Sequence, residues 1–167
     1  MDITDIARID ADTVLDRYLG SRFPIDSVAL AVTMGMESYW INNTDLASIA
    51  TKKPDGLRIV GTNQYESTSR QRFACAHAIG HHMKQYARQL PHDYIFHCYQ
   101  FDFNNWITPE ELYANTFAAN LLMPPDVLED LARDHDTKDL AEFFDVTMKI
   151  VRYHAATLGI HVKPMHL

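Results

Sequence analysis

Two histidines at helical spacing are the residues of this sequence best placed to do chemistry. His77 and His81 lie four positions apart within a proline-free stretch, residues 70–87, that is rich in helix formers. One helical turn takes about 3.6 residues, so both imidazoles project from the same face of the predicted helix. Two nitrogens at that spacing can bind one Zn²⁺, and a catalytic ion also needs a third protein ligand and an open position.

The residues around the histidine pair help to decide whether it is a metal site or part of an exposed helix face. Such pairs also occur on partly exposed helix faces that bind nothing. Here the surrounding residues are small and would let another element approach the helix backbone closely: Ala74, Ala76, Ala78 and Gly80. A solvated helix face has no need of such residues, so the sequence favours a metal site.

A second helix could supply the third ligand. Thr108 as N-cap, Pro109 at the first helical position and Glu111 three residues after the cap predict a helix that ends near Met123. Glu111 lies on the edge of a core-facing apolar stripe, where a carboxylate is costly unless it is paired or bound to a metal. The stripe is formed by Ala114, Phe117, Ala118 and Leu121. The alternative is a capping-box glutamate that reaches back to the backbone at Thr108.

The remaining pattern predicts an α+β fold. Helical periodicity covers most of the first 34 residues and returns from residue 69 onward. Between these regions lie apolar runs typical of strands, at residues 36–41, 47–51 and 57–61. The sequence Pro54-Asp55-Gly56 predicts a turn that joins the last two runs into a hairpin. We therefore expect one domain over residues 1–167, with a small, mostly antiparallel sheet between helices.

Composition and charge exclude several classes of protein. Hydrophobic residues make up 47% and charged residues 22%, as in an ordinary globular domain. No apolar run approaches the roughly 20 residues that span a bilayer. The net charge of −7 argues against a protein that grips nucleic-acid phosphates or anionic membranes. The N-terminus does not resemble a secretory signal, so we expect a cytoplasmic protein with two free thiols, Cys75 and Cys98.

Two longer motifs around these residues resemble the ImmA/IrrE metallopeptidases. The first, Arg-x-Arg-Phe-x-x-Ala-His-x-x-Gly-His, spans residues 70–81, and the second, Glu-x-x-Ala-Asn-x-Phe-Ala-x-x-Leu-Leu-Met-Pro, spans residues 111–124. The resemblance covers about residues 20–160. It implies a zincin-like fold in which an N-terminal helix (1–20) precedes a family-like core (21–160) and a short tail (161–167).

The resemblance also implies the metal ligands. His77, His81 and Glu111 occupy the positions of the zinc-binding residues in the family motifs. Two histidines and one carboxylate would also suit Mn²⁺ or Fe²⁺, so the ligand set does not choose the ion. Asn115, one turn after Glu111, is a candidate to orient one of the ligands without touching the ion itself.

One position departs from the family pattern. Where the family has the glutamate of His-Glu-x-x-His, this chain has Ala78. That glutamate binds no metal; it takes a proton from the attacking water and passes it to the leaving amine, which is worth about 10²–10⁴ in rate. Alanine cannot do so, and we expect this chain to be inactive as a peptidase. Because every other motif position is kept, a glutamate replaced by alanine is favoured over a natural pseudo-enzyme, and both stay open.

The family resemblance suggests a protein substrate. Its substrates are often helix-turn-helix transcriptional repressors that are cut once, so a repressor or an antitoxin is the expected partner. No separate DNA-binding domain precedes residue 20, and we therefore expect that partner to be another chain. The substrate could add as an extra strand along the predicted strand Leu57–Gly61.

Two other functions are open at this point. A non-catalytic pseudo-peptidase could bind and sequester a repressor or an antitoxin. A helix-turn-helix at residues 139–158, with Thr147 as the cap of a recognition helix, could bind DNA directly. Acidic residues crowd the preceding stretch and would repel phosphates, so direct nucleic-acid binding is disfavoured.

The other histidines carry weaker predictions. His82 points about 100° away from His81 on the helix and is expected at the surface or behind the ligands. His92, His97 and Cys98 match no strong zinc-binding spacing. We therefore interpret them as part of a segment that packs through its aromatic residues.

Overall fold

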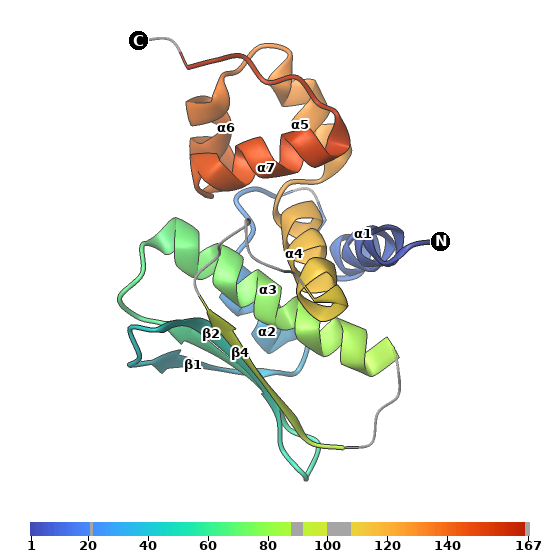
Figure 1. Cartoon of the computed structure of the whole chain (residues 1–167), viewed down its shortest axis with the longest axis vertical. Helices are drawn as coiled ribbons and strands as arrows, with labels where there is room; N and C mark the ends of the chain where they lie inside the picture. The colour runs from blue at the N-terminus through green and yellow to red at the C-terminus, as the bar shows by residue number, and fades with distance from the viewer. Residues whose placement is uncertain (21, 88–91, 100–107, 166–167) are drawn as a thin grey trace.

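The computed structural model describes residues 1–20, 22–87, 92–99 and 108–165 and has the predicted α+β fold (Figure 1). Ahead of the sheet come α1 (Ile3–Val14), a π-helical turn η1 (Leu15–Leu19) and α2 (Ser27–Thr33). The strands are β1 (Glu37–Ile41), β2 (Leu46–Lys52), β3 (Arg58–Asn63) and β4 (Tyr94–Tyr99). The long helix α3 (Thr68–Ala87) separates β3 from β4. The last helices are α4 (Pro109–Leu122), α5 (Pro125–Ala132), α6 (Thr137–Phe144) and α7 (Met148–Leu158).

Helices begin where the sequence places capping side chains. The Asp26 carboxylate accepts from the Ala29 N–H at 2.9 Å at the start of α2. Thr108 Oγ1 accepts from the Glu111 N–H at 3.2 Å at the start of α4. Thr147 caps α7 in the same way. Each cap satisfies a backbone N–H that the first helical turn leaves without a partner.

The sheet has the strand order β1-β3-β2-β4 and is mostly antiparallel. β2 runs antiparallel to both β3 and β4, whereas β1 pairs with β3 in parallel. The expectation that Leu57–Gly61 offers a free edge to a peptide was wrong, because β3 is covered by β1 on one side and β2 on the other. Among the described strands, β1 and β4 are the outer ones.

The strand β4 falls in a segment, residues 92–103, for which the sequence pattern predicts no element. Its residues 94–99 form the strand, and residues 100–103 lie outside the described part of the chain. Side chains alternate along it between the helix-covered face and solvent, so Cys98 is buried while His97 and Tyr99 are exposed. The strand thereby brings Cys98 under α3.

The helix α3 is buried between the sheet and the other helices. β2 and β3 contact it on one side and α4 on the other, and α1 in turn packs against α4 (Figure 1). At Gly80 a Cβ would lie only 3.0 Å from the Ala114 Cα, so this close approach of α3 and α4 favours glycine. This confirms the role that the small residues of α3 predict. The Tyr113 hydroxyl donates to the Asp10 carboxylate and ties α4 to α1.

The last three helices, α5 to α7, gather at one end of the molecule beyond α4 (Figure 1). Arg72 of α3 connects this end to the rest, because its guanidinium donates to the Asp145 carboxylate and to the Ile25 carbonyl. The Arg72 carbonyl also accepts from the Ser27 hydroxyl at 2.7 Å. The ring of the buried His154 in α7 lies 3.0 Å from the Met123 carbonyl oxygen at the end of α4.

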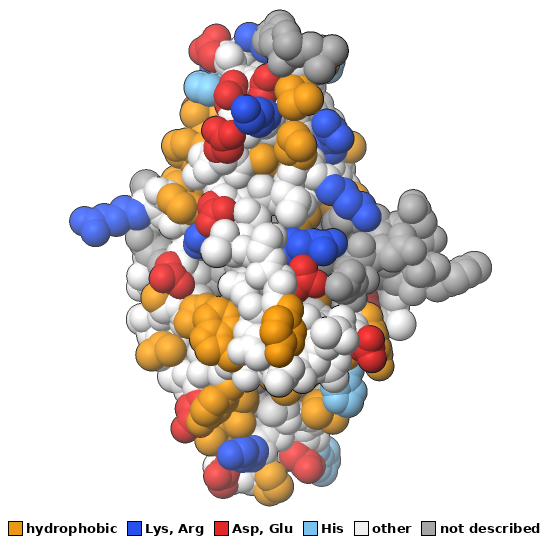
Figure 2. Space-filling model, turned by 90° about the vertical axis from the view of Figure 1, so that its left-hand side faces the viewer, with side chains coloured by type: hydrophobic (Ala, Val, Ile, Leu, Met, Phe, Trp, Pro, Cys, Tyr) orange, Lys and Arg blue, Asp and Glu red, His pale blue; other side chains and the backbone are white. Residues whose placement is uncertain are grey.

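Exposed aromatic residues lie on the two outer strands. Tyr39 and Trp40 of β1 and Tyr99 of β4 are each more than half exposed. Figure 2 shows hydrophobic side chains over much of one face, with a group of them in the lower half and charges of both signs above and below that group. Within the described residues, no helix combines the length and the apolar character needed to cross a membrane.

Candidate metal centre

The two histidines of α3 face each other across one helical turn. His77 and His81 are fully buried, and their Nε2 atoms lie 3.0 Å apart. Their rings meet edge to face, with centroids 4.7 Å apart. The ring of Phe96 on β4 stacks on His81 and fixes its orientation. The helical spacing thus brings both nitrogens to a single point, as their positions in the sequence predict.

Glu111 of α4 brings its carboxylate to the same point. Its Oε2 lies 3.2 Å from His77 Nε2, and its Oε1 lies 3.2 Å from His81 Nε2. The Glu111 backbone N–H donates to Thr108, so the cap at the helix start forms while the carboxylate itself lies at the histidines. The neighbouring Glu110 points elsewhere and forms an ion pair with Lys84 at 3.2 Å. One glutamate of the pair therefore belongs to the cluster.

These distances fit a divalent ion held by three side chains. A tetrahedral zinc ion with bonds of 2.0–2.1 Å has ligand atoms about 3.3 Å apart. The distances among the two imidazoles and the carboxylate are 3.0–3.2 Å. A cation at their centre would compensate the gathered lone pairs and the carboxylate charge, which are costly to bury without one. The residues present therefore fit the metal that the sequence motifs imply.

Asn115 fixes the tautomer of His77. Its Oδ1 lies 2.9 Å from His77 Nδ1, and because an amide oxygen only accepts, Nδ1 carries the proton. When the ring is neutral, as a metal-binding histidine must be, Nε2 carries the lone pair and directs it at His81 and Glu111. This is how a residue outside the coordination sphere orients a histidine for a metal. Asn115 lies one turn beyond Glu111 on the same face of α4.

The cluster perturbs the acidity of its own members. Burial by itself would raise the pKa of Glu111, but His77 and His81 outweigh burial and hold that pKa well below its usual range. Burial would likewise lower the pKa of His77, yet Cys98 and Glu111 raise it above the ordinary value. Glu111 is consequently ionised at neutral pH and available as a ligand.

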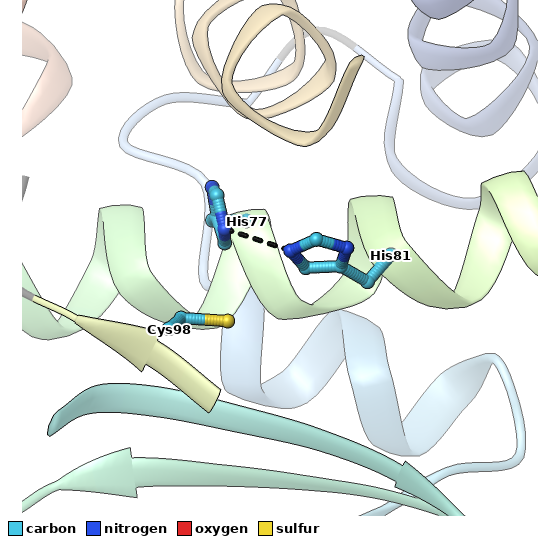
Figure 3. Close-up of side chains that lie close together, drawn as sticks. All are labelled: His77, His81 and Cys98. Carbon is cyan, nitrogen blue, oxygen red and sulfur yellow. Dashed lines mark hydrogen bonds between the residues drawn. The ribbon is translucent and has the colours of Figure 1, made fainter. Parts of the chain in front are cut away.

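Cys98 is a member of this cluster that the sequence interpretation missed. Its sulfur and the ring nitrogens of His77 and His81 lie within 4.8 Å of one another, and all three residues are buried (Figure 3). The segment does pack through Tyr94 and Phe96, as the sequence interpretation expects, but that interpretation does not place Cys98 beside His77 and His81. The sequence does offer one signal for the direction of the Cys98 side chain. In a strand, alternate residues share a face, so Cys98 lies on the same side of β4 as Tyr94 and Phe96.

The neighbouring histidines do not join the cluster. His82 is fully buried, so the expectation of a surface position was wrong. Its Nδ1 pairs with the Tyr94 hydroxyl at 2.6 Å and its Nε2 with the Ile59 carbonyl at 3.0 Å, because the sheet covers that side of α3. Burial lowers the pKa of His82 to about 4. His97 is exposed on the opposite face of β4, and His92 is exposed ahead of it.

Ala78 occupies the place between the two histidines. It is fully buried, and its methyl group has no atom that can take up or release a proton. The chain thus combines two imidazoles, a carboxylate and a thiol with an inert residue at the position that carries the glutamate in His-Glu-x-x-His.

Comparison with known proteins identifies the family. Residues 38–155, more than half of the chain, match the peptidase M78 family, described as an IrrE N-terminal-like domain. The chain belongs to the peptidase M78 family. The matched region includes the four residues of the cluster, so this M78 domain is of metallopeptidase type.

A solved structure has a similar fold. A transcriptional regulator from Mycobacterium tuberculosis matches with a TM-score of 0.55 and 14% sequence identity. The match covers 91% of this M78 chain and 47% of the regulator, so the chain spans about half of that protein's length. At this identity the likeness shows the fold alone. No curated protein matches the sequence.

Proposed function

We propose that this chain is a zinc-binding domain of the M78 peptidase type that recognises a protein partner and, with alanine at position 78, does not hydrolyse it efficiently. The observation that carries the proposal is the convergence of His77 Nε2, His81 Nε2 and the Glu111 carboxylate within 3.0–3.2 Å. Mn²⁺ and Fe²⁺ are alternatives to zinc for these three ligands.

The roles of the side chains follow from their positions. His77 and His81 would hold the ion from α3, Glu111 would hold it from α4, and Asn115 would keep the His77 lone pair directed at it. When bound, the ion supplies Lewis acidity toward a peptide carbonyl and toward water. A base at position 78 would be needed to move the proton from water to the leaving amine, and Ala78 cannot do so.

The partner segment would bind along β4 and not along β3. Among the strands that the structure describes, β4 pairs only with β2, and it carries Phe96 and Cys98 beside the histidine pair. A peptide that adds to this edge would pass beside the cluster while its backbone pairs with the sheet. We propose a transcriptional repressor or an antitoxin as the partner. Its charge pattern would complement a chain with a net charge of −7.

A second candidate is a pseudo-peptidase that holds its partner by sequestration. The specific observation in its favour is the buried Cys98 sulfur within 4.8 Å of the histidine nitrogens, where a hydrolytic ion would need an open position. Both candidates share the metal centre and the partner surface. They differ in whether restoring a proton acceptor at position 78 is enough for turnover.

The discriminating experiment compares Ala78→Glu with Ala78→Gln, both loaded with one equivalent of zinc. The probes are a defined library of unstructured peptides and candidate helix-turn-helix regulators produced with this chain, and cleavage is read by mass spectrometry. If the peptidase proposal holds, Ala78→Glu cleaves about 10²–10⁴ times faster than Ala78→Gln, which restores size without a proton acceptor. Binding of a regulator with no cleavage by Ala78→Glu would favour sequestration. A protein that retains no more zinc than His77→Ala would overturn both.

A further inference from the structure

The Cys98 thiol lies beside the histidine pair of the metal centre. Figure 3 shows its side chain extending from β4 toward the histidine pair. Glu111 reaches the same pair from α4, on the other side of α3 from the sheet. The histidine pair of α3 is thus approached by Glu111 from α4 and by Cys98 from β4.

The distances leave room for a bond to sulfur. With zinc–sulfur bonds of about 2.3 Å and zinc–nitrogen bonds of about 2.0 Å, an ideal tetrahedron places sulfur and nitrogen about 3.5 Å apart. The three ligand atoms of His77, His81 and Cys98 lie within 4.8 Å of one another. A shift of about an ångström, within the reach of a single side-chain rotation, would close the difference.

The surroundings of Cys98 differ from those of the second cysteine. Cys75 is also buried, but it lies in the core beside Thr62, and burial raises the pKa of its thiol to about 12. Cys98 lies instead at the histidine pair, and its sulfur and the ring nitrogens of His77 and His81 are within 4.8 Å of one another. The chain therefore contains one inert thiol and one thiol beside the proposed metal ligands. Substitution of Cys75 can thus serve as the control for substitution of Cys98.

We propose that the Cys98 thiolate is the fourth protein ligand of the metal, so that the centre is a closed site of two histidines, one glutamate and one cysteine. This inference rests on the proposed metal centre. Binding releases the thiol proton to solvent and forms the metal–sulfur bond without any change of oxidation state. Four protein ligands are typical of structural zinc sites, whereas catalytic sites keep one position for water. A soft thiolate also selects zinc over Mn²⁺.

The closed site has a functional consequence. Water cannot occupy a position that sulfur fills, so hydrolysis is suppressed at Cys98 as well as at Ala78. A chain with Glu in place of Ala78 would regain full turnover only when the thiolate leaves the ion. Recognition of a partner along β4, the strand that carries Cys98, is then coupled directly to the coordination of the metal.

Cobalt substitution tests the proposal, because Co²⁺ replaces zinc in such sites and reports its ligands by absorption. The metal-free chain is titrated with Co²⁺, and two signals are recorded: the visible bands of a bound tetrahedral ion and the near-ultraviolet charge-transfer band of a cobalt–thiolate bond. We expect both signals in the unmodified chain and in Cys75→Ala. We expect Cys98→Ala to keep the visible bands and to lose the charge-transfer band. Chelator competition should show zinc affinity reduced by at least about tenfold in Cys98→Ala, which is the lower end for loss of a supporting residue.

The outcomes separate this inference from the proposed function. Visible bands without a charge-transfer band in the unmodified chain would overturn the thiolate ligand and leave the three-ligand centre standing. A charge-transfer band that persists in Cys98→Ala would overturn it as well. No cobalt signal at all would overturn the metal centre itself. Cys98→Ser serves as a second variant, and circular dichroism confirms that each variant is folded before its spectrum is compared.

Discussion

At the scale of single residues, Asn115 decides how His77 can act. Its side-chain oxygen accepts the Nδ1 proton at 2.9 Å and leaves Nε2 as the only nitrogen of that ring with a lone pair. Without that acceptor the ring could turn or change tautomer, and the lone pair would no longer be directed at Glu111. The ligand geometry therefore depends on a residue that never touches the ion.

The first prediction follows from this contact. Asn115→Ala should lower zinc affinity about 10–100-fold, because such orienting partners typically contribute that much. Asn115→Asp, which keeps an acceptor, should retain most of the affinity. Affinity is measured by competition with a chromogenic chelator. Asn120→Ala is the control, since Asn120 is buried on the same helix and bonds to the Thr116 carbonyl instead. Equal losses in Asn115→Ala and Asn120→Ala would contradict a specific role.

The residue scale also shows what the sequence reveals and what it does not. His77 and His81 could be predicted because helical periodicity alone places them on one face. Glu111 could be named as a candidate because a carboxylate beside an apolar stripe is costly without a partner, and the family resemblance then favoured a ligand over a capping-box glutamate. For Cys98, strand alternation predicts only which face of β4 the thiol is on, whereas its proximity to the histidines depends on the pairing of β4 with β2, a contact that no local pattern encodes. His82 was misplaced for the same reason, since the sheet buries it.

At the scale of elements, local residue patterns predict the helix starts and the hairpin, but they do not predict the order of the strands in the sheet. The caps at Asp26, Thr108 and Thr147 start the helices that they predict. The hairpin of β2 and β3 follows from its turn residues. The position of β3 inside the sheet depends on its parallel pairing with β1. A crossover of that kind leaves no signature in the hydrophobic pattern, so the edge strand was assigned to the wrong element.

The second prediction concerns the contact between α7 and the end of α4. Burial lowers the pKa of His154 from 6.5 to about 4. The unfolded chain binds this proton near pH 6.5 and the folded chain only near pH 4, so the unfolding free energy falls as the pH is lowered through that window. Between pH 7 and pH 5 the His154 contribution amounts to about 2 kcal/mol.

His154→Gln tests this contribution, because an amide can donate to the Met123 carbonyl and does not titrate. Urea unfolding of the metal-free protein at pH 7 and pH 5 should show a smaller loss of stability in the variant than in the unmodified chain. His135→Gln, a change at an exposed histidine, should leave the pH dependence as it is. A pH dependence that His154→Gln shares in full would contradict the assignment.

At the scale of the whole molecule, the metal centre exists only in the folded chain. Its ligand atoms come from α3 and α4, and the two helices meet at a close contact that favours glycine at position 80. An ion that binds both helices favours the folded state by mass action. The bound metal should therefore stabilise the packing of α3 against α4 in the hydrophobic core.

The third prediction is that zinc raises the melting temperature. At a free concentration of about 100 times the dissociation constant, the gain is about 2.7 kcal/mol, which corresponds to a shift of roughly 5–10 °C for a chain of this size. Scanning calorimetry with zinc and then with excess chelator should show the shift and its reversal. His77→Ala should show neither. A shift of the same size in His77→Ala would place the bound ion elsewhere on the surface.

Arg72 gives the molecule a mechanical property as well as stability. Its one side chain holds both the turn after α6 and the segment ahead of α2, and it belongs to the helix that carries His77 and His81. A force applied to the C-terminal helices is therefore transmitted to the histidine-bearing helix at Asp145, which accepts from Arg72 and also from the Ser69 hydroxyl of the same helix at 2.8 Å. A protein that binds α5 to α7 could therefore displace the helix that carries His77 and His81 without contacting the proposed metal ligands.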